Sequence, residues 1–267
     1  MKVLHAITSL DKGGAENHLA ILSKEQQINK NNISIFISKN STYWTNSLKK
    51  VGIKIYKSKF FNEKYYILKL YKLIKDIIYL VKLINNNEPD VLHAHLPYME
   101  LVSFIALKFS NHKPRYIITK HVDNIFFKGS YGQKKSFLGS LIARIISERT
   151  FKIIAISNAV KKFLISKFVG INKKKIKIVK YGLDDIQLLT RKEKNYKFKK
   201  LKFLKKKNLV IGCIARLVPQ KSIDNILKSI SLIKNKKIIL VIVGKGPLKL
   251  ELINLSKQLK IYNQIIW

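Results

Sequence analysis

Cysteine is almost absent from the sequence, which holds a single thiol, Cys213, among 267 residues. One cysteine excludes an internal disulfide and a cysteine-based zinc site. Cys213 lies within the apolar run 209–215, where a thiol packs as a small buried residue. Stability must therefore come from a hydrophobic core, for which the apolar 47% of the residues is sufficient material.

Long hydrophobic runs are also missing. Apolar stretches such as 209–215 and 77–81 fall far short of the roughly 20 residues that a membrane-spanning helix needs. The N-terminal segment 1–7 has too short an apolar part to be a signal peptide. We therefore expect a cytoplasmic protein.

Acidic residues are scarce, with 15 Asp and Glu against 53 Lys and Arg, for a formal net charge of +38. Such a charge suits nucleic acid, an anionic membrane surface or a polyanionic substrate. Most of the cations are lysines, and the chain is also rich in Ile and Asn, the pattern of an AT-rich genome. No aromatic-rich RNA motif or zinc-finger spacing accompanies the charge, so we expect no nucleic-acid partner.

A membrane surface stays open as a partner because of the segment 60–84, which mixes tyrosines and aliphatic residues with lysines. A core helix whose lysines extend outward explains this pattern, and we favour it. An amphipathic helix lying on an anionic bilayer is the alternative. A peripheral position at the inner face of the membrane would then follow.

Short β-branched runs alternate with segments of helical period over the first 180 residues or so, which predicts parallel strands joined by crossover helices. The expected strands are 2–8, 33–38, 53–57, 90–95, 115–121, 151–157 and 175–180. The expected helices are 15–29, 42–51, 64–87, 98–110, 135–149 and 158–168. The fold class is α/β, and residues 1–190 form a doubly wound, Rossmann-like domain.

A basic segment, 191–207, has ten basic residues in seventeen and reads as a linker. A new strand and helix pattern then begins, with strands 209–215 and 238–243, helices near 222–233 and 247–260, and a third strand from residue 264. Residues 208–267 are about half of an ordinary domain. We expect an incomplete second Rossmann-like domain with one uncovered sheet edge and face.

Glycines follow the first strand, where Gly13 and Gly14 precede a helix. Glycine there lets backbone N–H groups approach a phosphate or a sugar, although a plain tight turn explains the pair equally well. The spacing is not G-x-G-x-x-G, which argues against dinucleotide binding.

Histidines end the fourth and fifth strands, at His93, His95 and His121. The His-x-His spacing is compatible with a metal, but no third ligand lies nearby in the sequence. We favour structural roles for His93 and His95 and expect no metal.

Two cations, Arg216 and Lys221, lie between the strand 209–215 and the next helix. Arginine binds phosphate oxygens in bidentate fashion, lysine adds a point charge, and the helix N-terminus adds its dipole. A solvated loop is the alternative explanation. Gly244 and Gly246 close the following strand in the same way.

Taken in order, these motifs resemble the retaining GT-B glycosyltransferases of family 4. The resemblance rests on Gly13-Gly14-Ala15-Glu16, the segment 89–95, Thr119-Lys120-His121, Ile156-Ser157-Asn158, Gly182-Leu183-Asp184, the segment 215–221 and the segment 243–247. It implies two facing Rossmann-like domains, a nucleotide-diphosphate sugar held mainly by the second domain, an acceptor held mainly by the first, and no cofactor or metal.

The resemblance also implies roles for individual residues. Arg216, Lys221 and Gly14 would bind the donor diphosphate, and His121 would be catalytic, touching the donor sugar or positioning the acceptor. The further site candidates are Gly13, Glu16, His95, Gly244 and Gly246. The implied reaction moves a hexose to a glycan or lipid-linked acceptor in cell-surface polysaccharide synthesis, such as lipopolysaccharide or capsule.

Three departures accompany the resemblance. Ser222 and Tyr181 stand where the family commonly has glycine and asparagine. The family's two glutamates separated by seven residues, which hold the donor sugar, have no counterpart here, so we expect a chain truncated in its second domain. The alternative function is a catalytically incomplete remnant, or half of a split protein, that acts only by binding.

Overall fold

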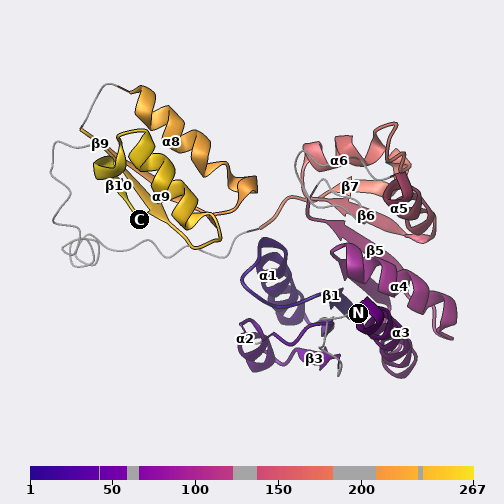
Figure 1. The fold of residues 1–267 in the computed structure, drawn as a ribbon. Helices are drawn as coiled ribbons and strands as arrows, with labels where there is room; N and C mark the ends of the chain where they lie inside the picture. The colour runs from indigo at the N-terminus through magenta and orange to yellow at the C-terminus, as the bar shows by residue number, and fades with distance from the viewer. Residues whose placement is uncertain (42, 59–65, 123–136, 183–208, 234–236) are drawn as a thin grey trace. The chain divides into compact units, whose positions relative to one another are not determined.

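A computed structural model describes residues 1–41, 43–58, 66–122, 137–182, 209–233 and 237–267 (Figure 1). The chain divides into two compact units, Met1–Ile186 and Gln187–Trp267. The expected linker 191–207 lies outside the described residues.

The first unit is a parallel sheet of seven strands in the order β3-β2-β1-β4-β5-β6-β7. The strands are β1 (Lys2–Ile7), β2 (Asn32–Ile37), β3 (Lys54–Lys57), β4 (Val91–His95), β5 (Arg115–Lys120), β6 (Lys152–Ala155) and β7 (Ile176–Ile178). The helices are α1 (Gly14–Ile28), α2 (Thr45–Lys50), α3 (Tyr66–Asn87), α4 (Pro97–Phe109), α5 (Phe137–Arg149) and α6 (Asn158–Ile165). The strand order reverses between β1 and β4, and such a switch point is where doubly wound sheets bind ligands.

Local sequence explains where several helices begin. Ser157 caps α6, since its Oγ accepts a hydrogen bond from the N–H of Val160 at 3.2 Å. Pro97 opens α4, where its fixed φ suits the first turn and its missing N–H costs nothing. The Ser157-Asn158 pair of the sequence motif is therefore a helix cap.

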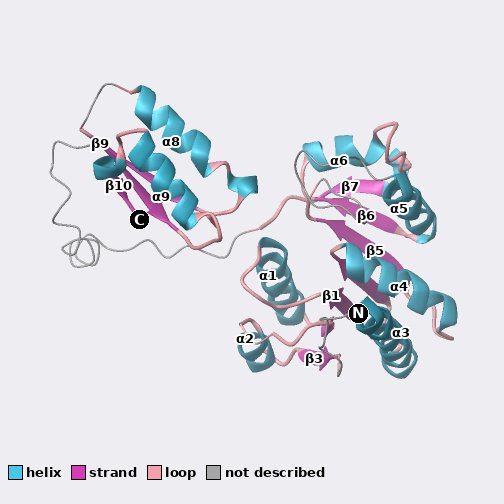
Figure 2. Ribbon diagram, viewed as in Figure 1, coloured by secondary structure: helices cyan, strands magenta, loops and turns pink. Residues whose placement is uncertain are grey.

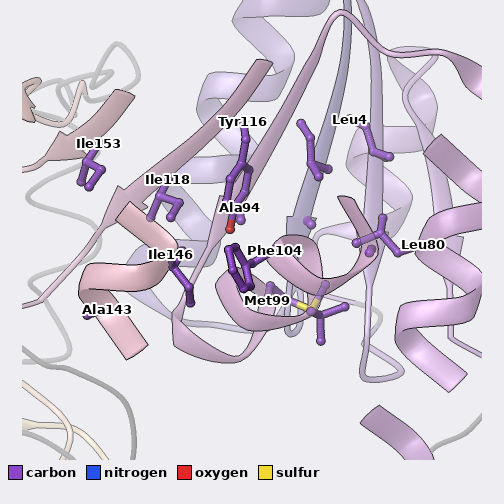
Figure 3. Packing of buried hydrophobic residues seen from close by; sticks show 14 of the residues in the cluster. Leu4, Leu80, Ala94, Met99, Phe104, Tyr116, Ile118, Ala143, Ile146 and Ile153 are labelled. Atoms are coloured by element: carbon purple, nitrogen blue, oxygen red, sulfur yellow. The ribbon is translucent and has the colours of Figure 1, made fainter. Parts of the chain in front are cut away.

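Helices cover both faces of the first sheet, so its central strands are buried. Every residue of β4 is buried. On one face, sheet residues such as Leu4, Tyr116 and Ile153 pack against side chains of α3, α4 and α5, as Figure 3 shows for Leu80, Met99, Phe104, Ala143 and Ile146. On the other face, a second core lies under α1 and α2 and includes Leu19 and Leu48.

Two buried ion pairs lie inside this unit. Lys120 Nζ lies 2.5 Å from Glu100 Oε2, which joins the end of β5 to α4. Lys72 Nζ lies 2.7 Å from Asp76 Oδ2, and the hydroxyl of Tyr98 also donates to this oxygen at 2.7 Å. The sequence-based expectation that the lysines of 60–84 extend outward is therefore wrong for Lys72, which is only 3% exposed.

The second unit has three parallel strands in the order β10-β9-β8. They are β8 (Leu209–Ile214), β9 (Ile238–Val243) and β10 (Ile265–Ile266), with helices α8 (Ile223–Leu232) and α9 (Lys249–Gln258). Both helices pack on one face of the sheet against residues such as Leu240 and Ile242 (Figure 2). The opposite face is exposed, with Ile214 86% and Val243 54% accessible, as expected for a partial domain.

The described residues include no helix that is both long and apolar enough to cross a lipid bilayer.

Candidate functional site

The glycine turn lies between β1 and α1, at the switch point of the first sheet. Gly13 is extended (φ −115°, ψ 162°) and Gly14 is the first residue of α1. A side chain added at Gly14 would meet open space, so the backbone there is accessible to a ligand. A Cβ added at Gly13 would overlap the carboxylate of Glu16.

Glu16 therefore lies over this turn, where Ser9 Oγ donates a hydrogen bond to its Oε1 at 3.2 Å. A carboxylate at the first turn of α1 already complements the partial positive charge of the helix N-terminus. It also repels a second anion. The turn thus suits hydroxyl groups of a sugar better than a phosphate, which bears against the diphosphate-binding role inferred for Gly14.

A series of hydrogen-bonded side chains runs from α1 to the carboxyl edge of the first sheet. His5 Nε2 lies 2.8 Å from Gln26 Oε1, and His5 Nδ1 lies 3.3 Å from His95 Nε2. His95 Nδ1 lies 3.1 Å from His121 Nε2, and His121 Nδ1 bonds the hydroxyl of Tyr181. We call these five residues the histidine row.

The imidazoles of the histidine row are neutral near pH 7. Burial lowers the pKa of His5 to about 4 despite its bond to Gln26, and burial together with the neighbouring His18 and Lys120 lowers the pKa of His121 to about 3. Burial also holds the pKa of His95 well below its ordinary value. Each ring therefore has one N–H donor and one lone pair.

Tyr181 and His18 cover the outer end of the row. Their rings stack at a centroid distance of 4.0 Å and an interplanar angle of 12°. Burial, with a smaller effect of Glu16, raises the pKa of Tyr181 to about 12, so its hydroxyl keeps its proton. His121 is 9% exposed, and the histidine inferred to be catalytic thus has both ring nitrogens engaged.

His93 lies beside the row. Its Nε2 lies 2.7 Å from Thr119 Oγ1, and its ring centroid lies 4.2 Å from that of His95. One nitrogen each from His5, His93 and His95 lie within 4.8 Å of one another, a set that could hold a metal ion. The direct 3.3 Å contact between His5 and His95, however, is satisfied as a hydrogen bond.

Sequence reasoning missed His5, Gln26 and His18. His5 becomes a neighbour of the other histidines only because β1 pairs with β4 in the register His5↔His93. A histidine in the middle of a buried strand was the available signal, since a buried imidazole needs partners. The sequence did not point to Gln26, because a glutamine on a helix that is partly exposed to solvent needs no buried partner.

In the second unit the loop after β8 carries both inferred phosphate ligands. Arg216 follows β8 closely and Lys221 ends the short helix Pro219–Lys221. Both are exposed, as is Lys245 on the loop after β9. No ion pair of Arg216 or Lys221 occurs within the described parts of the chain, so their charges face solvent and are available to an anionic ligand.

Gly244 and Gly246 let these two loops pack backbone to backbone. A Cβ at Gly244 would overlap the carbonyl of Ala215, and one at Gly246 would overlap the carbonyl of Leu217. The N–H of Leu217 donates to the carbonyl of Lys245 at 3.0 Å, and the N–H of Leu248 donates to the carbonyl of Leu217 at 3.2 Å. These two glycines therefore fix the backbone on both sides of Arg216.

Ser222, the N-cap residue that precedes α8, lies in the left-handed region, with φ 49° and ψ 43°. A non-glycine residue adopts this region at a steric cost, which is why glycine suits the position. The serine side chain makes no capping hydrogen bond to the helix.

A cavity of about 690 Å³ lies at the opposite edge of the first sheet, beside the amino ends of β5 and β6. Its lining includes Lys108, Arg115 and Phe151. Parallel sheets of this type bind ligands at the carboxyl edge, so we do not assign the reaction to this cavity.

Comparison with known families matches residues 12–186 to the model described as Glycosyltransferase Family 4. The chain belongs to glycosyltransferase family 4. Residues 193–267 of this family 4 member match a second model, described as Glycosyl transferases group 1. The family and the fold expected from the motifs are thereby confirmed.

Among curated relatives, this family 4 chain is similar to an uncharacterized glycosyltransferase of Methanocaldococcus jannaschii. The two are 32% identical over 152 residues, which make up 55% of this chain and 37% of that protein. The matched part therefore spans well under half of the relative's length.

Two solved structures share the fold with this family 4 chain at low sequence identity. A glycosyltransferase of Rickettsia africae is 19% identical with a TM-score of 0.74, and the match covers 100% of this chain and 67% of that one. Anabaena HepE, solved in complex with UDP-glucose, is 19% identical with a TM-score of 0.78, and the match covers 100% of this chain and 68% of that one.

Proposed function

We propose that this protein moves a hexose from a nucleotide-diphosphate sugar to a glycan or lipid-linked acceptor, with retention at the anomeric carbon. The observation that carries the proposal is the pair of solvent-facing cations, Arg216 and Lys221, on the loop after β8 of a family 4 chain. A role in cell-surface polysaccharide synthesis is part of the proposal and rests on the family resemblance.

Arg216 and Lys221 would neutralise the diphosphate as its bond to the sugar breaks. Arginine offers a planar pair of N–H donors, and lysine offers a point charge. Because Gly244 and Gly246 lock the loop against its neighbour, the cations are held in place before the ligand arrives, which is the condition for electrostatic catalysis. The proposed reaction needs no metal to carry the leaving group.

The glycine turn and the histidine row would serve the sugar side of the reaction. Gly14 offers an open backbone, Glu16 offers a carboxylate that accepts hydroxyl hydrogens, and His121 is the outermost histidine of the row at the same edge of the sheet. A hydroxyl-rich ligand satisfies these groups, whereas an anion would be repelled by Glu16.

Peripheral contact with an anionic membrane is proposed for α3. Leu70, Ile74 and Ile78 are 60%, 47% and 47% exposed at helical spacing, among lysines such as Lys75. Sedimentation with vesicles tests this contact, with binding to anionic and not neutral lipid as the expected result. Equal binding of the variant Ile74→Asp would contradict it.

Calorimetry with UDP-glucose and GDP-mannose tests the donor site, with UDP-glucose chosen because HepE was solved with it. Removing one charged partner of a phosphate costs about 1.5–3 kcal/mol, so Arg216→Ala is expected to weaken donor binding about 10- to 150-fold. The control Lys228→Ala removes the same charge from the exposed Lys228–Asp224 pair on α8 and is expected to bind normally. Equal affinity of Arg216→Ala and the wild type would overturn the assignment.

A second candidate, binding without turnover, is favoured by the exposed apolar face of the second sheet, which includes Ile214 and Val243. It predicts that the chain binds the donor and transfers no sugar until a polypeptide covering that face is added. Robust transfer by the chain alone would exclude it.

A further inference from the structure

The hydrogen bonds of the histidine row all run in the same donor-to-acceptor direction. Its inner end is Gln26 Oε1, and an amide oxygen only accepts hydrogen bonds. His5 must therefore carry its proton on Nε2 and present the lone pair of Nδ1 to His95. The same requirement passes outward from ring to ring, because each neutral imidazole has one donor and one acceptor.

Applied to the next two rings, this requirement defines their tautomers. His95 donates from Nε2 to His5, so its Nδ1 accepts from Nε2 of His121. His121 is then left with a lone pair on Nδ1, which accepts the hydrogen of the Tyr181 hydroxyl. All three rings are Nε2–H tautomers, and the row delivers one unprotonated nitrogen to the carboxyl edge of the sheet.

We propose that Gln26, His5 and His95 are positioning residues that hold His121 as the Nε2–H tautomer, with its Nδ1 lone pair aimed at the hydroxyl of a sugar substrate. The proposal rests on the proposed function. Tyr181 occupies the position that the sugar hydroxyl takes when the substrate binds, and the substrate hydroxyl donates to the same nitrogen.

Burial makes this arrangement cooperative. His5 and His95 are 0% exposed, so a single ring in the other tautomer would leave two N–H groups facing each other at one junction and two lone pairs at the next. Unpaired polar groups in the interior are costly. The three rings therefore reverse together or not at all, and reversal would set the Nε2 lone pair of His5 against Gln26 Oε1.

Nitrogen NMR of the chain labelled with ¹⁵N-histidine tests the tautomers without any ligand. Long-range ¹H–¹⁵N correlations distinguish a protonated ring nitrogen from an unprotonated one. We expect Nε2 protonated and Nδ1 unprotonated in His5, His95 and His121. A protonated Nδ1 in His121 would overturn the proposal.

The variant Gln26→Leu removes the acceptor that orients the row, and Gln26 is half-buried on α1, so the fold should tolerate it. Loss of one hydrogen bond is expected to lower the ratio of Nε2–H to Nδ1–H tautomer of His121 about fivefold. Gln26→Glu keeps an acceptor oxygen and is expected to restore the wild-type spectrum. Gln258→Leu makes the same chemical change on exposed α9 and serves as the control.

The variant Tyr181→Phe tests which end of the row determines the tautomer of His121. The proposal predicts that His121 stays in the Nε2–H form in this variant, because Gln26 and not Tyr181 sets the direction. A tautomer change in Tyr181→Phe with none in Gln26→Leu would overturn it.

Zn²⁺ added to the chain tests the competing arrangement in which His5, His93 and His95 hold a metal. A metal ion bound by these three rings would disturb the hydrogen bond between His5 and His95, and a change in the ring nitrogen signals of His5, His93 and His95 at stoichiometric Zn²⁺ would overturn the proposal. An unchanged spectrum supports it. These readouts need no donor sugar, so a failed donor-binding experiment leaves them interpretable.

Discussion

The two units share one pattern of alternating strands and helices, but the first buries many of its polar side chains whereas the second leaves its charged side chains exposed. In the first unit every residue of β4 is buried, and the histidine row and the Lys120–Glu100 pair lie inside. In the second unit β8 is largely exposed, and Arg216 and Lys221 stand in solvent. Replacing a polar side chain of the first unit should therefore lower the free energy of unfolding, whereas replacing a charged side chain of the second should change it little.

The largest expected effect breaks the Lys120–Glu100 pair. Glu100→Ala leaves a buried ammonium without its carboxylate, and such losses cost about 3–5 kcal/mol. The matched change in the second unit, Asp224→Ala, removes an exposed i,i+4 partner worth about 0.3–0.5 kcal/mol. Urea unfolding of both variants measures the difference. Equal costs would show that burial does not separate the two units as described.

Glycine substitutions are expected to have the next largest effect on stability, and here the second unit is the more sensitive of the two. Gly244→Ala forces a Cβ into the carbonyl of Ala215, and overpacking of this kind costs about 1–3 kcal/mol. Gly14→Ala points into open space in the first unit and is expected to leave stability nearly unchanged. Thermal unfolding compares the two. A neutral Gly244→Ala would mean that the loops after β8 and β9 are not locked together.

Acidic pH should weaken the first unit through its buried imidazoles. The pKa values of His5 and His121 fall from an ordinary 6.5 to about 4 and about 3 in the folded state. The unfolded state therefore takes up protons first, so stability is complete above about pH 6.5 and declines as the pH falls toward 4. Each such ring contributes at most about 1.4 kcal/mol per pH unit. Urea titrations at several pH values check this, and stability that is flat between pH 7 and 5 would contradict it.

The smallest effect is a gain in the second unit. Ser222→Gly removes the cost of a left-handed non-glycine residue, with an expected stabilisation of about 0.5–1 kcal/mol at most. Replacing Ser157 with glycine at the cap of α6 loses a real hydrogen bond and should not stabilise. Paired thermal unfolding measures both. Destabilisation by Ser222→Gly would show that the serine has a role that the geometry does not reveal.

Much of the fold follows from the sequence because strands and helices have different apolar periods. The glycine turn, the start of the helix at residue 158 and the loop of Arg216 all lie where the pattern places them. Local pattern does not carry register, and the pairing of His5 with His93 is what builds the histidine row. It also does not reveal that Glu16 folds over Gly13.

In the second unit the sequence likewise does not reveal which groups lie next to each other in the fold. The sequence suggests that Gly244 and Gly246 let a ligand approach the backbone, but their closest neighbours are the carbonyls of Ala215 and Leu217. Close approach of two backbones far apart in sequence leaves no local signal beyond the glycine itself. The burial of Lys72 beside Asp76 was not foreseen for a different reason: a Lys–Asp pair at i,i+4 spacing is equally compatible with an exposed helix face.

Amide NMR of the ¹⁵N-labelled chain during a titration with UDP tests most directly whether the second unit binds the donor diphosphate. We expect the chemical shifts around Arg216, Lys221 and Gly246 to change, and we expect Arg216→Ala, but not Lys228→Ala, to remove most of that change. Shifts confined to other surfaces, or a full response in Arg216→Ala, would show that Arg216 does not bind the diphosphate.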